Sequence, residues 1–167
     1  MDYFIVKSLI CPLLVFFYSD WAGNADNRKS TTGGCFYVGA NLVAWMSKKQ
    51  NYVSLSTVET EYIATGSCCS QLLWMKKILT DYGISQDTMV VYCDNSSVID
   101  ISKNPVQHSK TKHIEIRYYF IRDLVERKIM YLEYILTERQ NVNIFTKPLD
   151  RSKFETLRQV ISMILCP

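Results

Sequence analysis

Short apolar runs alternate with longer amphipathic stretches along the chain, a pattern typical of a mixed α/β domain. Residues 9–17 form an apolar run and the chain becomes polar after Asp20, so the sequence predicts a buried strand that ends on this acid. Two β-rich segments, residues 35–38 and 42–46, lie on either side of Gly39 and predict a hairpin.

The rest of the chain alternates predicted helices and strands. Residues 56–82 have helical periodicity, with Ser56 or Thr57 as N-cap and Gly83 as the stop. A buried strand over residues 89–93 again ends on an acid, Asp94. The remaining predicted elements are a brief helix over 96–102, a helix to about residue 127, a strand over 130–135, a helix over 138–147 stopped by Pro148, and a last helix with Phe154, Leu157, Ile161 and Ile164 on one face. This order predicts an α/β fold, a mixed sheet flanked by helices.

Composition agrees with a single globular domain. The chain has 167 residues, of which 48% are hydrophobic and 21% are charged, which excludes a disordered or fibrous chain. No repeat or low-complexity linker divides the sequence. The net charge of +3 permits a nucleic-acid partner but is too small to indicate one by itself.

The cysteines and the apolar start bear on the cellular compartment. Six cysteines form no C-x-x-C pair, so the sequence favours reduced, mostly buried intracellular thiols over a zinc site or a disulfide framework. The run over residues 9–17 resembles the core of a signal peptide or anchor, but it contains Pro12 and lacks a basic flank. A membrane span needs roughly 20 apolar residues. We therefore expect a strand there, no membrane partner and no secretion. Membrane attachment through this run is the less favoured alternative.

Three acids are candidates for chemistry. Acids at the ends of buried strands are costly unless they serve a metal or a charge partner, and Asp20 and Asp94 hold such positions. At 100° per residue Glu61 shares a helix face with Cys68, so we expect it to face the sheet and Glu59 to face solvent. Carboxylates suit hard divalent cations, so this set indicates metal-assisted attack on a phosphodiester.

Each acid also has an ordinary structural explanation. Asp20 could open a turn, Asp94 could cap the helix that follows it, and Glu61 could be favoured by the helix dipole. Spacing alone therefore leaves metal-dependent hydrolysis as one hypothesis among several.

Seven specific sequence runs occur in order between residues 18 and 158. They are Y-S-D-W-A-G (18–23), D-N-R-K-S-T-T-G (26–33), N-L-V-A-W-M-S-K-K-Q (41–50), L-S-T-V-E-T-E-Y-I-A (55–64), V-Y-C-D-N-S-S (91–97), K-N-P-V-Q-H-S-K-T-K-H-I-E-I-R-Y (103–118) and I-F-T-K-P-L (144–149). Together they resemble the ribonuclease H domain at the C-terminal end of copia-type retrotransposon, retrovirus-related Pol polyproteins.

The resemblance implies a ribonuclease H-like fold with a five-stranded mixed sheet. It further implies endonucleolytic cleavage of the RNA strand of an RNA:DNA hybrid with two Mg²⁺ ions, for which Mn²⁺ could substitute. Carried over by motif, Asp20, Glu61 and Asp94 are catalytic metal ligands. The corresponding domain covers residues 18–158, preceded by a poorly matching segment over 1–17 that supplies part of the first strand and followed by a helix end over 159–167.

Three departures from the family pattern stand out. The pattern A-D-I-F-T-K-P-L carries a fourth acid where this chain has Asn143, and we expect the lost charge to weaken one metal and to lower the rate on the order of a thousandfold. The pattern Y-S-D-A-D-W-A-G is two residues longer than the run here, so Asp20 matches either acid of that pair. A one-residue slip in the strand would turn its carboxylate to the other face. Tyr119 stands where a histidine is frequent.

Basic residues supply candidate contacts to nucleic-acid phosphates, although a solvated loop is the plain alternative. His108 or His113 could act as a general acid, and a capping or surface role is the alternative. We expect Trp21, Trp45 and Trp74 to pack in the core or hairpin and not to stack on bases. One basic group comprises Lys103, His108, Lys110, Lys112, His113 and Arg117, and a second strip comprises Arg28, Lys29, Lys48 and Lys49.

The expected partners follow from the resemblance: an RNA:DNA hybrid and the reverse transcriptase domain of the same polyprotein. We expect the isolated domain to be a monomer, located in cytoplasmic virus-like particles or the nucleus. Three functional hypotheses stay open. They are a working ribonuclease H, a weakened fold that still binds nucleic acid, and a retroelement remnant with no molecular task.

Overall fold

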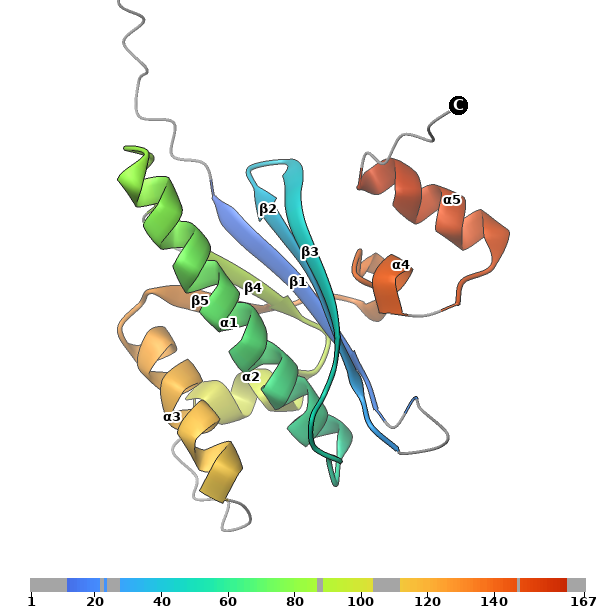
Figure 1. Cartoon of the computed structure of the whole chain (residues 1–167), viewed down its shortest axis with the longest axis horizontal. Helices are drawn as coiled ribbons and strands as arrows, with labels where there is room; N and C mark the ends of the chain where they lie inside the picture. Colours follow the sequence, from blue (N-terminus) through green and yellow to red (C-terminus); the bar gives the residue numbers. More distant parts are fainter. Residues whose placement is uncertain are drawn as a thin grey trace, which may run out of the picture.

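The computed structural model describes the backbone of residues 12–21, 23, 28–86, 89–103, 112–146 and 148–161, and their side chains except those of 112–115. Within these ranges a five-stranded sheet has the order β3-β2-β1-β4-β5 (Figure 1). Strand β1 pairs antiparallel with β2 and parallel with β4. The strands are β1 (Leu13–Asp20), β2 (Thr31–Val38), β3 (Asn41–Lys49), β4 (Met89–Cys93) and β5 (Met130–Tyr134). The predicted five-stranded mixed sheet is therefore confirmed.

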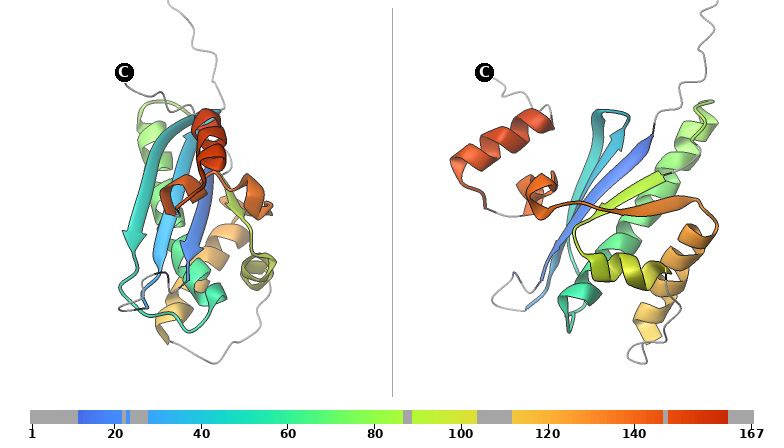
Figure 2. Two further views of the ribbon diagram at one scale, coloured as in Figure 1. Left: turned by 90° about the vertical axis from the view of Figure 1, so that its right-hand side faces the viewer. Right: turned by 180° about the vertical axis from the view of Figure 1, so that it is seen from behind.

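Helices cover both faces of the sheet (Figure 2). Helix α1 packs on β1 and β2, and α3 packs on α1, α2 and β5. On the opposite face α4 packs on β1, β2 and β3, and α5 packs on α4. The helices are α1 (Thr57–Asp81), α2 (Ser96–Lys103), α3 (Lys112–Glu126), the 3₁₀ turn η1 (Thr137–Arg139), α4 (Asn143–Thr146) and α5 (Arg151–Val160).

Alternation along β1 divides its side chains between the two faces. Leu13, Val15 and Phe17 are buried in the larger core beneath α1. Leu14, Phe16 and Tyr18 pack against a smaller cluster that contains Val142 and the α4 side chains. Because side chains alternate along a strand, Asp20 lies on the α4 face of β1.

The start and end of α1 follow from its sequence. Ser56 is the N-cap, and its Oγ accepts a hydrogen bond from the Glu59 backbone N–H at 3.1 Å. Gly83 follows the helix with φ +77°, a conformation that side chains with a Cβ rarely adopt. The expectation for Glu59 was wrong: it is only 9% exposed, because its Oε2 accepts a hydrogen bond from Leu55 N at 2.7 Å. Glu59 thus completes a cap of the helix and does not face solvent.

The predicted helix over residues 138–147 is interrupted. The 3₁₀ turn η1 ends at Arg139, Gln140 has an extended conformation with no exposed surface, and the short helix α4 begins only at Asn143. Gln140 and Val142 are both fully buried, and Val142 packs with side chains of the sheet, so burial overrides the local helical preference.

Two sequence expectations concern the cysteines and the apolar start. Cys35, Cys68, Cys69 and Cys93 are free and buried, as expected, whereas Cys11 and Cys166 lie outside the described residues. Residues 13–17 of the apolar run belong to β1. In the described ranges, none of the helices combines the length and the apolar character needed to cross a bilayer.

Candidate active site

Asp94 directly follows the central parallel strand β4. The next residue, Asn95, caps α2, since its Oδ1 accepts a hydrogen bond from Ser97 N at 3.0 Å. Asp94 is therefore not the residue that caps this helix, and helix capping does not explain the acid at this position. Its carboxyl lies at the end of β4, where parallel sheets commonly place functional groups.

Glu61 lies in the second turn of α1, on the side that faces the sheet, as the helical periodicity predicts. Burial, and after it the negative charge of Asp94, raise the pKa of Glu61 to about 7, and a hydrogen bond with the Asn95 side chain acts in the opposite direction. The Glu61 Oε2 is buried without a hydrogen-bond partner among the described residues. The structure thus brings Glu61 and Asp94 together and leaves one carboxylate oxygen unpaired beside them.

Asp20 ends β1 on the opposite face of the sheet from α1. The last residue pair of the parallel ladder between β1 and β4 is Phe16 with Tyr92, so continuing the register places Asp94 level with Tyr18. Asp20 lies two residues farther along, about 7 Å at the rise of a strand. Its carboxylate lies over Gly23, where any Cβ would overlap it. Because residue 23 is a glycine, the Asp20 carboxylate has space beyond the end of β4.

Asn143 occupies the first position of α4 and is 2% exposed. Its Nδ2 donates a hydrogen bond to the Thr137 carbonyl at 3.1 Å. Its Oδ1 is buried with no partner in the part of the chain that the structure describes. Asn143 and Asp20 share one face of the sheet, and Glu61 approaches from the other.

Helix α4 is held against the sheet by two contacts that sequence reasoning missed. Gly33 on β2 has no Cβ, and a Cβ there would overlap the Thr146 methyl group and meet Val142 at 3.0 Å. Trp45 on β3 stacks on Phe145 with ring centroids 4.9 Å apart and planes 4° apart. No local sequence signal marks either contact, because both join elements distant in the chain.

The tryptophans are more exposed than expected. Trp21, Trp45 and Trp74 are 48%, 56% and 58% exposed, so the prediction that they pack in the core was wrong. The hairpin packing expected of them does occur at Trp45, through its stack on Phe145. Trp21 donates from Nε1 to the Ser54 carbonyl at 3.3 Å.

The donor set fits a hard divalent cation only in part. Glu61 and Asp94 offer carboxylate oxygens, one of them an orphaned buried atom, whereas Asp20 and Asn143 belong to the α4 face of the sheet, where the Asn143 Oδ1 is also buried without a partner among the described residues. Among the described residues, however, no group of three or more His, Cys, Asp and Glu side chains is placed to hold a metal ion. The metal-binding role of Asp20, Glu61 and Asp94 as a set stays a prediction.

The predicted basic contacts fall into different places. Lys48, Lys49 and Arg117 line one pocket between β3, α1 and α3. Arg28 precedes β2 with φ 51°, and Lys103 ends α2 with an exposed side chain. His108 and Lys110 lie outside the described residues, as do the side chains of Lys112 and His113.

Comparison with known proteins gives relatives among transposon polyproteins. The chain is 41% identical over 145 residues, 87% of its length, to the retrovirus-related Pol polyprotein from transposon TNT 1-94 of Nicotiana tabacum. It is 36% identical over 165 residues, 98% of its length, to the Pol polyprotein from transposon RE2 of Arabidopsis thaliana. The chain spans only 11% of each of these relatives. No family model matches it.

Solved structures give the fold. LC11-RNase H1, isolated from compost, superposes with a TM-score of 0.58 at 14% identity, covering 90% of this chain and 96% of that one. RNase H1 from Halobacterium salinarum has a TM-score of 0.55 at 11% identity, covering 78% and 90%. The foamy viral protease-reverse transcriptase in complex with an RNA/DNA hybrid has a TM-score of 0.55 at 13% identity, covering 89% and 20%. This chain therefore belongs to one region of the retrovirus-related Pol polyproteins of copia-type transposons and has a ribonuclease H-like fold.

Proposed function

We propose that this domain hydrolyses the RNA strand of RNA:DNA hybrids in a metal-dependent reaction that Asn143 weakens. The observation that carries the proposal is the pair of carboxylates, Glu61 and Asp94, at the end of β4 with one buried oxygen left unpaired. A divalent ion held there would activate water for attack on a phosphodiester and stabilise the leaving oxygen.

The residues of the chain divide the remaining tasks. Glu61 and Asp94 would bind the metal, and burial around Glu61 strengthens its attraction for a cation. Asp20 would add a ligand from the α4 face of β1. Asn143 offers an amide oxygen where the family pattern has an acid, so this position keeps a ligand and loses a negative charge.

The substrate class is supported by the relatives. The foamy viral protease-reverse transcriptase, which shares the fold, has a solved structure in complex with an RNA/DNA hybrid. The polyprotein relatives are several times longer than this chain, so we propose that a reverse transcriptase domain of the same polyprotein supplies the hybrid. The cations that would contact its phosphates and that lie among the described residues are Arg28, Lys48, Lys49, Lys103 and Arg117.

A second candidate function is hybrid binding without cleavage. The missing charge at Asn143 and the absence of a three-acid metal group among the described residues favour it. A domain with this function would keep its basic contacts to the phosphates, but its metal site would not support hydrolysis.

The two functions are separated by supplying the full chain with four end-labelled substrates in Mg²⁺ and in Mn²⁺. These are an RNA:DNA hybrid, double-stranded RNA, single-stranded RNA and double-stranded DNA. We expect cuts only in the RNA strand of the hybrid, and loss of those cuts in Asp94→Asn. Hybrid binding with no cut in either metal would instead assign the second function.

A further inference from the structure

A buried amide, Gln50, lies between the sheet and the start of α1. Gln50 directly follows β3 and is 5% exposed. Its Nε2 donates to Thr32 Oγ1 on β2 at 2.9 Å and to the Thr60 carbonyl on α1 at 3.0 Å. Its Oε1 accepts from Ser54 Oγ at 3.3 Å, and its backbone N–H donates to the Ser30 carbonyl at 2.8 Å. One residue therefore joins β2, the loop after β3 and the first turns of α1.

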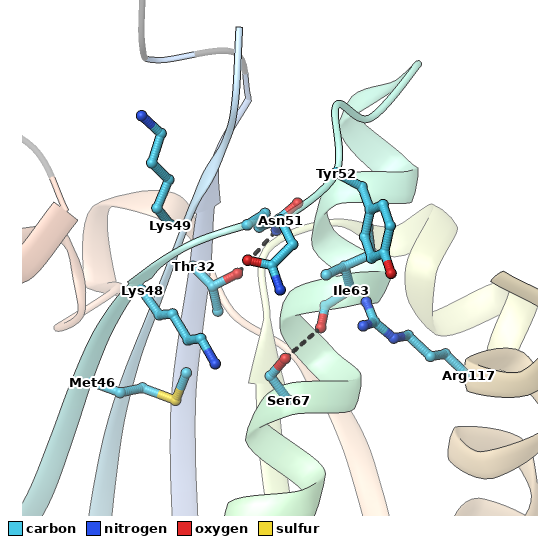
Figure 3. Close-up of a pocket in the computed structure, with 10 residues that line it drawn as sticks. Thr32, Met46, Lys48, Lys49, Asn51, Tyr52, Ile63, Ser67 and Arg117 are labelled. Atoms are coloured by element: carbon cyan, nitrogen blue, oxygen red, sulfur yellow. Dashed lines mark hydrogen bonds between the residues drawn. The ribbon is translucent and has the colours of Figure 1, made fainter. Parts of the chain in front are cut away.

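The two acceptors of this amide group are neighbours of predicted metal ligands. The Thr60 carbonyl is part of the peptide group that carries the Glu61 backbone nitrogen. Thr32 pairs with Ser19 in the ladder between β1 and β2, and Ser19 directly precedes Asp20. Figure 3 shows the Thr32 hydroxyl on the side of β2 toward α1, with a hydrogen bond drawn at its oxygen. The amide thus connects the helix that carries Glu61 with the strand pair that carries Asp20.

The layer between the sheet and the first turns of α1 is polar. Its side chains are each at most 3% exposed, and they are Ser30, Thr32 and Thr60. Hydrophobic packing is non-directional, whereas a hydrogen bond has a preferred length and angle. The Ser30 and Thr60 hydroxyls also contact each other, at 3.4 Å, and the two bonds from the Gln50 amide are shorter. The position of this end of α1 on the sheet therefore depends on directional bonds, and Gln50 makes the two shorter of these three.

The geometry suits a primary amide. Such a group has two N–H donors and one carbonyl acceptor, and the Gln50 side chain has a partner for its nitrogen on each of two elements and another partner for its oxygen. A buried polar network whose members are all bonded is rigid. A methionine has nearly the same length and none of these groups, so Gln50→Met removes the bonds at little change in volume.

We propose that Gln50 is a positioning residue, which holds Glu61 at the distance from Asp94 that a shared divalent cation needs. The inference rests on the proposed function for the identity of the reaction. Gln50 touches neither the substrate nor the metal and acts through Thr32 and the peptide group between Thr60 and Glu61. Residues that orient a metal ligand typically change metal affinity or activity by about tenfold to a hundredfold when they are replaced. Loss of the amide should therefore lower kcat and metal affinity and leave hybrid binding unchanged.

The first readout separates positioning from substrate binding. We expect Gln50→Met to lower kcat on a labelled RNA:DNA hybrid by about tenfold or more, with KM roughly unchanged. Thr32→Val removes one acceptor and should lower kcat less. Thr32→Ser keeps the hydroxyl and should restore most of the kcat lost in Thr32→Val. Because Thr32→Val leaves Gln50 in place, it carries the same test if Gln50→Met does not fold.

The second readout needs no cleavage. Mn²⁺ is titrated into the full chain without substrate, and paramagnetic broadening of the backbone amide resonances of Glu61 and Asn95 is followed by NMR. We expect Gln50→Met to weaken Mn²⁺ binding by about tenfold. Asp94→Asn should abolish the broadening, which assigns the ion to the carboxylate pair.

Met75→Ala is the control for lost stability. Met75 is buried in the core farther along α1, so its truncation destabilises the fold without removing a bond of Gln50. All variants are assayed under conditions in which urea unfolding shows them to be fully folded. We expect Met75→Ala to keep the kcat and the Mn²⁺ affinity of the parent. Equal losses in Met75→Ala and Gln50→Met would reduce the role of Gln50 to stability and overturn the proposal.

The two proposals fail in different ways. If the parent binds Mn²⁺ at Glu61 but cleaves no hybrid, the proposed function fails, and weaker Mn²⁺ binding in Gln50→Met still supports this inference. If Gln50→Met cleaves hybrid and binds Mn²⁺ as the parent does, the proposed function stands and this inference falls. A parent chain that binds no Mn²⁺ at Glu61 contradicts both.

Discussion

Glu61 on α1 and Asp94 at the end of β4 interact closely enough that the charge of Asp94 adds to the effect of burial in raising the Glu61 pKa to about 7. The two residues come from different layers, one from a helix and one from the sheet. Two ionised carboxylates this close repel each other, and the Asn95 side chain offsets only part of that repulsion, so a bound cation would stabilise the pair.

The first prediction concerns stability against pH without metal. Because the Glu61 pKa is raised from 4.5 to about 7 by folding, the folded state holds a proton that the unfolded state releases between these values. The free energy of unfolding should therefore fall as pH rises through this window. Between pH 4 and pH 8 the free energy of unfolding of Glu61→Gln should rise by about 2 kcal/mol relative to that of the parent, after allowance for partial solvent screening. Chemical denaturation at both pH values in EDTA measures it.

Glu133→Gln, on an exposed position of β5, is the matched control for that experiment. If the gain in Glu61→Gln were no larger than in Glu133→Gln, Glu61 would not be held in a costly ionised state. Addition of Mg²⁺ at pH 8 should raise the free energy of unfolding of the parent more than that of Glu61→Gln.

The second prediction concerns the amide at Asn143. Asn143→Asp replaces the donor that bonds the Thr137 carbonyl with a buried acceptor. We expect the free energy of unfolding to fall by about 2 kcal/mol in EDTA. Mg²⁺ should restore much of this stability, because a cation would compensate the new charge. Thermal unfolding of the full chain in the two conditions checks this, with Asn41→Asp at an exposed position as control. A loss that Mg²⁺ does not reduce would mean that no metal reaches Asn143.

The third prediction concerns how α4 is placed. Gly33→Ala would drive a Cβ into the Thr146 methyl group and toward Val142, so we expect a loss of about 2 kcal/mol. Thr146→Ser removes that methyl group and should recover part of the loss in the double variant. Urea unfolding of the two single variants and the double variant gives the coupling. Simple addition of the two single effects would show that Gly33 and Thr146 do not meet.

The fourth prediction compares two glycines under the same change. Gly66 is inside α1, and a Cβ there would make ordinary contacts with the Arg117 stem, so Gly66→Ala should stabilise by about 1 kcal/mol. Gly39 in the β2–β3 turn has φ +62°, so Gly39→Ala should destabilise despite open space around it. Both effects are measurable by urea unfolding, and a stabilised Gly39→Ala or a destabilised Gly66→Ala would contradict the backbone argument.

Local signals were sufficient for most elements of the fold. The bounds of β4 match the prediction, the N-cap of α1 is Ser56, one of the two residues predicted for it, and the hairpin turns at Gly39. These features depend on neighbours in sequence. The direction of Glu61 also followed from helical periodicity, since a 25-residue helix against a sheet has one inward side.

Local sequence patterns did not predict interactions that depend on tertiary packing. Glu59 was expected in solvent because periodicity ignores the capping bond to Leu55. The helix before Pro148 was expected to be continuous because no neighbouring residue in the sequence indicates that Gln140 and Val142 are buried. The level of Asp20 relative to Asp94 depends on the register between β1 and β4, which a single sequence does not fix.

A metal-dependent nuclease site at Glu61 and Asp94 is tested most directly by cleavage of a labelled RNA:DNA hybrid by the full chain, Asp94→Asn and Asn143→Asp, each in Mg²⁺ and in Mn²⁺. We expect slow cleavage by the parent, none by Asp94→Asn, and a rate in Asn143→Asp higher by on the order of a thousandfold. Cleavage by Asp94→Asn at the parent rate, or no cleavage in any of the three, would contradict a metal-dependent nuclease site at Glu61 and Asp94.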